Sequence, residues 1–288
     1  MKECLNDILA VEVIYRRKLA DTETFSSLSH SLEKLGGCLE LLVYDNSPEP
    51  MEPAHHDYPA WRIQYVHDSG NPGVSKAYNE GYRLARQLGK KWLLLLDQDT
   101  VFPEDALAVY CQGIEKCPQV TLFAPVLKAG EVICSPCRYL MRTGFHPKTV
   151  RTGIQMLQGK AVLNSGMLVR VDVFGRCGGF NERIRLDFAD FAFNNRLRRH
   201  YETFCVLPIQ CRHGFSGTGT VSRPDALRRF ELFREGAANS VESFTDGVLY
   251  SLVVLKRCIR LTVQFRSFCF VKSLLEMSKK RLNRKKDD

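Results

Sequence analysis

The sequence KWLLLLDQDT, residues 91–100, places four consecutive leucines before two aspartates, Asp97 and Asp99. A short apolar run bounded by polar residues is typical of a strand that is buried on both faces. The leucines require a protein interior, whereas the carboxylates require water, a cation or a proton. We therefore expect a buried strand that ends in an acidic pair at the edge of a sheet.

Strand and helix patterns alternate along the first hundred residues. Short apolar runs predict strands within residues 8–15, 39–47, 63–73 and 92–100. Apolar residues at helical spacing predict helices within residues 21–37 and 74–90, and a glycine pair ends the first of these. This order predicts an α/β fold with a mainly parallel sheet and helices on both faces. Ligands of such sheets bind beyond the carboxyl ends of the strands, where the polar residues of this sequence gather.

The second half of the chain is less regular. Helical patterns follow Pro103 and occupy residues 187–201, and strand patterns occupy residues 120–127 and 203–217. From Pro224 onward the pattern is helical with basic interruptions. We place a boundary near Val221, between an α/β domain of residues 1–220 and a basic helical extension of residues 221–288.

Positive charge is concentrated in the C-terminal extension. The chain carries a net charge of +9, and from Val221 onward it has 15 Lys and Arg against 8 Asp and Glu, so residues 1–220 carry only +2 of the total. Such a basic segment suits an anionic partner: a membrane surface, a nucleic acid or a phosphorylated substrate. Its apolar patches alternate with Lys and Arg, which fits either a helix on an anionic bilayer or a helical cap on the first domain.

The cysteines favour a reducing compartment. The chain has 11 of them, an odd number without framework spacing, and its N-terminus lacks the apolar core of a secretory signal. Cys134 and Cys137 form one CxxC, but no second pair stands at the spacing of a zinc site. The longest apolar run near the C-terminus stops at Lys256, too short to span a bilayer. We expect a cytoplasmic protein.

The acidic residues form two groups along the chain. Asp97 and Asp99 repel each other at a strand end, and a divalent cation such as Mg²⁺ or Mn²⁺ would relieve that repulsion. Asp187 and Asp190 lie three residues apart on one helix face, where one could act as a general base or both could only favour the helix dipole. His213 follows a later strand and is either a third metal ligand, a phosphate contact or a structural residue.

Seven motifs occur together in one order. They are VIYRRKLADTETFSSL, VYDNSPE, NPGVSKAYNEGYRLA, LLLLDQDT, NSGMLVRVDVFGRCGGFNE, LDFADFAFNNR and RHGFSG. In this order they resemble the motifs of family 2 inverting glycosyltransferases, which have the GT-A fold, and the resemblance covers residues 8–235. The DQD triplet followed by threonine is similar to that of the rhamnosyltransferase-like branch.

The resemblance implies roles for the matching residues. Asp99, with Asp97 acting directly, through water or through the donor sugar, would hold the Mg²⁺ or Mn²⁺ that bridges a diphosphate, and His213 would approach it. The nucleotide side would comprise Tyr15, Asp45, Asn71, Lys76 and Asn79. Asp190 occupies the position of the catalytic base, six residues before Arg196. Asp187 and Arg196 would shape the acceptor or sugar pocket.

The implied reaction is a single displacement with inversion. A nucleotide-diphosphate sugar, dTDP-rhamnose or a UDP-sugar, would be the donor, and a glycan or lipid-linked hydroxyl would be the acceptor. The resemblance thus points to polysaccharide biosynthesis on the cytoplasmic side of a membrane. The charge of the extension adds an anionic membrane surface as a candidate partner, and we expect no nucleic acid partner.

Three other functions fit parts of the sequence. LLLLDQDTV also matches the nucleophile motif of haloacid dehalogenase-type phosphatases, with Asp97 as nucleophile, but four elements precede it and Thr100 replaces the usual glycine. A nucleotidyltransferase would share the fold but needs an N-terminal glycine-rich loop. A non-catalytic sugar-nucleotide-binding protein would not need Asp97, Asp99 and Asp190 together.

Overall fold

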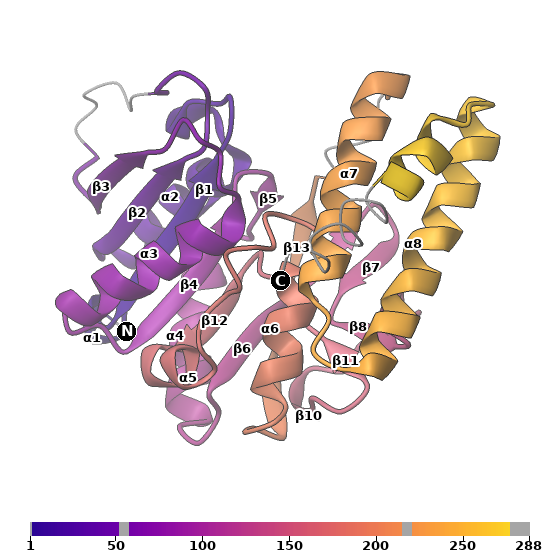
Figure 1. Cartoon of the computed structure of the whole chain (residues 1–288). Helices are drawn as coiled ribbons and strands as arrows, with labels where there is room; N and C mark the ends of the chain where they lie inside the picture. Colours follow the sequence, from indigo (N-terminus) through magenta and orange to yellow (C-terminus); the bar gives the residue numbers. More distant parts are fainter. Residues whose placement is uncertain (1, 52–57, 215–220, 277–288) are drawn as a thin grey trace.

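A computed structural model describes residues 2–51, 58–214 and 221–276 (Figure 1). Its main sheet has ten strands, eight of which lie in the order β10-β13-β6-β12-β4-β1-β2-β3, with β5 beside β13 and β7 beside β6. A second sheet has three strands in the order β11-β8-β9. The expected α/β class is confirmed.

The N-terminal half of the main sheet is entirely parallel. It consists of β1 (Ile8–Ile14), β2 (Leu39–Asp45), β3 (Trp61–His67) and β4 (Trp92–Asp97). Strand β1 is central, and its register pairs Val13 with Asp97 of β4 and Ile14 with Asp45 of β2. The carboxyl ends of these strands therefore meet at one edge, as the sequence predicts.

Two cores lie on opposite faces of this sheet. Alternate residues of β1 point to opposite faces, so Val11 joins one core and Ala10 the other. The first core includes α3 (Val74–Gln87) and α5 (Val171–Arg176), and the second includes α2 (Glu23–Leu35) and α4 (Ala106–Lys116). Burial on both faces explains why the strands are continuously apolar.

Local signals set the ends of α2. The hydroxyl of Thr22 accepts the N–H of Phe25 at the start, and Gly36 adopts a left-handed φ of 56° at the end. The short helices α1 (Lys2–Asn6) and η1 (Leu19–Asp21) flank β1. The predicted helix within residues 21–37 is thus confirmed with these narrower bounds.

The second half of the sheet is mixed. It contains β5 (Thr100–Val101), β6 (Leu122–Ala129), β7 (Val132–Ser135), β10 (Gly153–Met156), β12 (Met167–Arg170) and β13 (Thr203–His213). Strand β12 runs antiparallel between β4 and β6, while β13 is parallel to β6. The small sheet comprises β8 (Cys137–Leu140), β9 (Thr143–Phe145) and β11 (Lys160–Ala161).

The C-terminal third of the described chain contains the helices α6 (Ala189–Leu197), α7 (Arg223–Asn239) and α8 (Phe244–Phe265), besides a helical segment at residues 269–276. They contribute Phe193, Phe230 and Tyr250 to the same core as α3, so the C-terminal helices pack on the α/β layer. The domain boundary near Val221 remains a prediction.

The helices and the cysteines of the described residues bear on membranes and on redox state. Within the described residues, no helix combines the length and the apolar character needed to cross a membrane. All 11 cysteines are free thiols, and burial raises the pKa of Cys137 to about 11. The sequence suggests membrane contact for the basic tail, residues 273–288. Of this tail, residues 277–288 lie outside the described residues.

Candidate active site

The acidic turn after β4 is fixed by a buried threonine of α2. The hydroxyl of Thr24 accepts the N–H of Thr100 at 3.0 Å and lies within hydrogen-bond distance of the carbonyl oxygens of Asp97 and Thr100. Thr24 and Thr100 are both fully buried. The helix that follows β1 therefore holds both ends of the Asp97–Thr100 turn.

Asp97, Asp99 and His213 form a cluster whose candidate ligand atoms all lie within 4.8 Å of one another. His213 arrives from the end of β13, where it pairs with Thr100 of β5. Its Nδ1 is 2.9 Å from Oγ1 of Thr100 and 3.5 Å from Oδ1 of Asp99. The N–H of Gly214 donates to the carbonyl of Asp99 at 2.8 Å. The antiparallel β5–β13 pair thus brings a distant histidine to the acidic turn.

Polar groups surround the Asp97 carboxylate on both oxygens. Oδ1 accepts the hydroxyl of Tyr78 at 2.8 Å and the side-chain amide of Asn164 at 3.2 Å, and Oδ2 accepts the hydroxyl of Ser165. Burial raises the pKa of Tyr78 well above its usual value, so the phenol keeps its proton and donates it. Asp97 is therefore oriented before any ligand arrives.

The electrostatics of Asp99 fit a cation. Burial raises the pKa of Asp99 to about 6; His213 opposes this rise and the charge of Asp97 adds to it. Two crowded carboxylates and an imidazole form a donor set that Mn²⁺ accepts and that Mg²⁺ accepts through the oxygens. A divalent cation would offset the repulsion that the two carboxylates create. The residues present therefore fit a metal ion.

Asp190 stands beside this cluster in the first turn of α6. Its Oδ1 accepts the N–H of Asn164 at 3.3 Å, while the side chain of Asn164 donates to Asp97. Burial raises the pKa of Asp190 well above its ordinary value, and the charge of Asp97 adds to the effect. The side chain is still partly accessible to solvent. A carboxylate with a raised pKa next to a candidate metal site has the properties of a general base.

Asp187 faces the C-terminal helices. Its Oδ1 accepts Arg229 of α7 at 3.1 Å and lies 4.0 Å from Arg257 of α8. Next to it, Phe188 has a left-handed φ of 72°, and packing against Phe233 and Tyr250 maintains that strained backbone. Helices α7 and α8 thus hold the turn that presents Asp190.

Tyr15 lies next to the acidic turn. Its N–H donates to Oε1 of Gln98 at 2.8 Å, and its ring is exposed with the guanidinium of Arg16 5.2 Å from the ring centre. The structure therefore joins Tyr15 to the Asp97–Gln98–Asp99 segment, and its place on the nucleotide side remains a prediction.

Asp45 is fully buried and orders its own loop. Its carboxylate accepts the N–H of Ser47 at 2.8 Å, the N–H of Met51 at 2.7 Å and the hydroxyl of Tyr65 at 2.5 Å. Burial alone would raise the pKa of Asp45, but these hydrogen bonds hold it below its ordinary value. A direct nucleotide contact of Asp45 remains a prediction.

The remaining nucleotide-side residues do not converge on the cluster. Lys76 pairs with Asp68 at 2.8 Å, and the exposed Asn71 donates its N–H to the carbonyl of Asp68 at 3.1 Å. The side-chain amide of Asn79 exchanges hydrogen bonds with the backbone of Phe180. These contacts order the loop after β3 and join α3 to the loop before α6.

Arg196 points away from Asp190. Its guanidinium donates to the carbonyl of Gly179 at 2.6 Å, and burial lowers its pKa. Six residues along a helix rotate a side chain by roughly 240°, which explains the separation. Its role in an acceptor pocket remains a prediction.

Sequence reasoning missed the residues that hold the aspartates in place. Tyr78 and Asn164 contact Asp97 from α3 and from the loop before β12, and Thr24 holds the turn from α2. Tyr78 and Asn164 lie inside motifs of the resemblance, so a signal was present. Only the fold shows that they contact the same carboxylate.

Glu12 is a second buried carboxylate near the site. It lies inside β1, is 1% exposed and accepts the hydroxyl of Thr22 at 2.6 Å. Burial raises its pKa to about 8; the Thr22 hydrogen bond opposes the rise and the charge of Asp97 adds to it. Glu12 is therefore protonated in the folded protein at neutral pH.

This protonation predicts a pH-dependent stability. The folded state retains a proton that an unfolded Glu loses near pH 4.5, so the free energy of unfolding should fall as pH rises from about 4.5 to 8. Glu12→Gln should flatten this slope and stabilise the protein by about 2–5 kcal/mol at pH 8. Thermal unfolding between pH 5 and 8.5 measures it, with the exposed Glu33→Gln as control. Identical pH profiles for Glu12→Gln and wild type would contradict the assignment.

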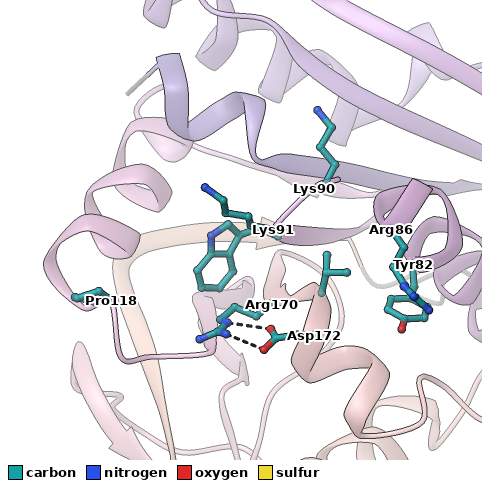
Figure 2. Close-up of a pocket in the computed structure, with 9 residues that line it drawn as sticks. Tyr82, Arg86, Lys90, Lys91, Pro118, Arg170 and Asp172 are labelled. Carbon is teal, nitrogen blue, oxygen red and sulfur yellow. Dashed lines mark hydrogen bonds and ion pairs between the residues drawn. The ribbon is translucent and has the colours of Figure 1, made fainter. Parts of the chain in front are cut away.

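A separate pocket lies at the opposite edge of the sheet (Figure 2). It has a volume of about 590 Å³ and is lined at the start of β4 by Lys91 and Trp92. Its charged groups already have partners: Arg170 pairs with Asp172 at 2.7 Å, and Lys91 pairs with Asp7 at 2.9 Å. This arrangement does not gather catalytic groups.

Comparisons with known proteins agree with the geometry of the acidic edge. Residues 24–161 match the family model of glycosyl transferase family 2. The match covers 138 of the 288 residues, a little under half of the chain, and includes Asp45, Asp97 and Asp99. No curated protein matches the sequence.

Several solved structures share the fold. GalNAc-T7 with UDP, GalNAc and Mn²⁺ aligns over 78% of this chain and 47% of its own, with a TM-score of 0.58 and 11% identity. The mannosyltransferase PcManGT from Pyrobaculum calidifontis, in complex with GDP-Man and Mn²⁺, aligns over 95% of this chain and 75% of its own (TM-score 0.56, 14% identity). TarS of S. aureus aligns over 82% of this chain and 40% of its own, with a TM-score of 0.51 and 14% identity.

These likenesses concern architecture. The chain spans less than half the length of the GalNAc-T7 and TarS chains, and identities of 11–14% establish the fold alone. The fold is GT-A, with a mainly parallel sheet between helices, as expected from the sequence.

Proposed function

We propose that this protein is an inverting, metal-dependent glycosyltransferase that uses a nucleotide-sugar donor. The observation that carries the proposal is the meeting of Asp97, Asp99 and His213 with Asp190 at the carboxyl edge of a GT-A sheet. The family match and the neighbours crystallised with Mn²⁺ and nucleotides support it.

The hydrogen bonds suggest different roles for Asp97 and Asp99 in metal binding. Both oxygens of Asp97 already accept donors, whereas Asp99 pairs only with His213 among the side chains of the described residues. Asp99 and His213 would therefore ligate the metal directly, and Asp97 would act through water or the donor sugar. When bound, the metal supplies positive charge that stabilises the leaving diphosphate.

Asp190 would take the proton of the acceptor hydroxyl as that oxygen attacks the anomeric carbon. Its raised pKa makes Asp190 a stronger base than an exposed aspartate. Asn164 hydrogen-bonds to both Asp190 and Asp97 and so fixes the position of one relative to the other. Tyr15, beside Gln98, would line the nucleotide side. Asp45, Asn71, Lys76 and Asn79 would shape that side through the loops they order.

The donor sugar and the acceptor are also part of the proposal. The donor to test first is dTDP-rhamnose, followed by UDP-sugars and GDP-mannose, because the DQD-Thr sequence resembles the rhamnosyltransferase-like branch. The acceptor would be a glycan or lipid-linked hydroxyl in cytoplasmic polysaccharide synthesis, and the free thiols suit that compartment.

The test is nucleoside diphosphate release from a panel of nucleotide sugars, with Mn²⁺ or Mg²⁺ and with EDTA. We expect metal-dependent turnover of at least one donor and an inverted anomeric product. Phosphate release from phosphomonoesters, lost in Asp97→Asn, would support the phosphatase alternative instead. Donor binding without turnover against any acceptor would favour the non-catalytic binding protein.

A further inference from the structure

Helix α8 exposes an apolar stripe along its whole length. The stripe begins at Val241, just before the helix, and its exposed fractions range from 39% to 89%. Within the helix the stripe residues are Phe244, Val248, Leu252, Leu255, Ile259 and Val263. At 100° per residue they fall within an arc of roughly 100°. The side chains that α8 buries, among them Tyr250, Val254 and Leu261, fall in a different arc. The helix is therefore apolar on two sides, of which only one is covered by the described residues.

Further exposed apolar residues lie after the C-terminus of the helix and on a hairpin tied to its first turn. Phe268, after the C-terminus of α8, is 80% exposed. At the other end, Arg142 pairs with Asp246 in the first turn of α8 and so ties down the β8–β9 hairpin, which exposes Leu140 and Met141. The helix is about 33 Å long, so this apolar surface is longer than the scattered patches of ordinary monomer surfaces. Helix α8 itself runs along the outer margin of the molecule (Figure 1).

The exposed charges on α8 itself are positive, whereas the exposed acids Glu242 and Glu276 lie outside the helix, before and after it. Lys256 and Arg260 are exposed and lie next to the stripe on one side of the helix. Arg266 and Lys272 follow it and are exposed as well. The only acidic residue of α8 is Asp246, which is buried and paired with Arg142. The sequence continues after residue 276 with six further Lys and Arg against two Asp.

We propose that α8 lies on an anionic lipid bilayer, with the stripe in the interfacial region and the flanking cations at the headgroups. An apolar arc bordered by Lys and Arg has the pattern of helices that bind in the plane of a membrane surface. A second copy fits less well, because a symmetric pair of α8 stripes would bring Lys256 and Arg260 of both copies together, and α8 itself exposes no acid to neutralise them. This inference goes beyond the proposed function and does not depend on it.

The docking surface would leave the active site accessible. The inner side of α8 carries Arg257, which is 4.0 Å from Asp187, three residues before Asp190. The bilayer would then be separated from the turn that presents Asp190 by at least one helix diameter, roughly 10 Å. An acceptor anchored in the same membrane would approach from that side.

Co-sedimentation of the full chain with vesicles tests the proposal, using phosphatidylcholine with and without phosphatidylglycerol. The double variant Leu252→Ser/Ile259→Ser removes two stripe residues that are 56% and 57% exposed. Its matched control is Ile154→Ser/Met156→Ser on β10, where the side chains are 50% and 51% exposed. We expect the first to weaken partitioning into anionic vesicles by about tenfold or more and the control to leave it unchanged.

Two further variants separate the sources of binding. Lys256→Glu/Arg260→Glu should weaken binding to anionic vesicles only, whereas Lys279→Gln/Lys280→Gln/Arg281→Gln should have a smaller effect than the stripe variant. No binding by wild type, or full binding by the stripe variant, would overturn the proposal. So would a dimer in sedimentation velocity that Leu252→Ser/Ile259→Ser dissolves, because a second copy would then cover the stripe. Donor turnover measured without vesicles reports on the proposed function separately.

Discussion

Asp190→Asn is expected to reduce kcat by about 10²–10⁴-fold, the usual contribution of a general base. Asparagine has nearly the same shape, and its side-chain oxygen can still accept the N–H of Asn164. The affinity for Mn²⁺ and nucleoside diphosphate should therefore stay within a few-fold of wild type. Nucleoside diphosphate release at saturating donor and acceptor measures the loss.

The pH profile distinguishes a base from a structural residue. Burial and the charge of Asp97 raise the pKa of Asp190, so the wild-type rate should rise with pH through a range above that of ordinary aspartates. This rise of the rate with pH should be absent in Asp190→Asn. Asp105→Asn, an exposed aspartate at the start of α4, should change neither the rate nor the profile. A variant at position 190 with wild-type kcat would remove Asp190 from the mechanism.

Asp99→Ala is expected to weaken Mn²⁺ binding by about 100-fold or more and to abolish measurable turnover. Among the side chains that the structure describes, the carboxylate of Asp99 pairs only with His213, so the fold should survive. Loss of metal removes the charge that stabilises the leaving diphosphate, an effect of about 10²–10³-fold or larger on kcat. Calorimetry and the paramagnetic resonance of Mn²⁺ measure binding independently of activity.

Protons should compete with the metal at this residue. The pKa of Asp99 is about 6 without a cation, so Mn²⁺ affinity should fall as pH decreases below about 6. EDTA should inhibit wild type and excess Mn²⁺ should restore it. Asp105→Ala serves as the control for both measurements. Full turnover in EDTA, or unchanged Mn²⁺ affinity in Asp99→Ala, would rule out the assigned metal site.

The N-terminal half of the fold was predictable because its signals are local. The leucines before Asp97 form a continuous run because β4 is buried on both faces, and Gly36 marks the end of α2 because its φ is left-handed. The antiparallel β12 was not predictable in the same way. It enters the sheet between β4 and β6 after a long irregular segment, and no local period records which strands a new strand will join.

The site was predictable as a set of carboxylates but not as a set of contacts. The strand-end position of Asp97 and Asp99 and the three-residue spacing from Asp187 to Asp190 are visible in the sequence. The structure turns Asp187 toward Arg229 and leaves Asp190 beside Asn164. The expectation that Asp187 and Asp190 lie on one helix face is wrong for Asp187, because α6 begins at Ala189 and the left-handed φ of Phe188 turns the preceding residue out of the helix. The packing of α7 and α8 decides what Asp187 contacts instead.

The sequence alone determined that a buried apolar strand delivers an acidic pair to the edge of an α/β sheet, because hydrophobic periodicity and covalent spacing are properties of short segments. Only the tertiary structure decided that Tyr78 and Asn164 orient Asp97, that His213 joins Asp99, and that no residue in the described ranges covers one side of α8. These contacts join residues that are tens to more than a hundred positions apart. Strand order, register and helix packing create them, and no local stretch of sequence specifies those.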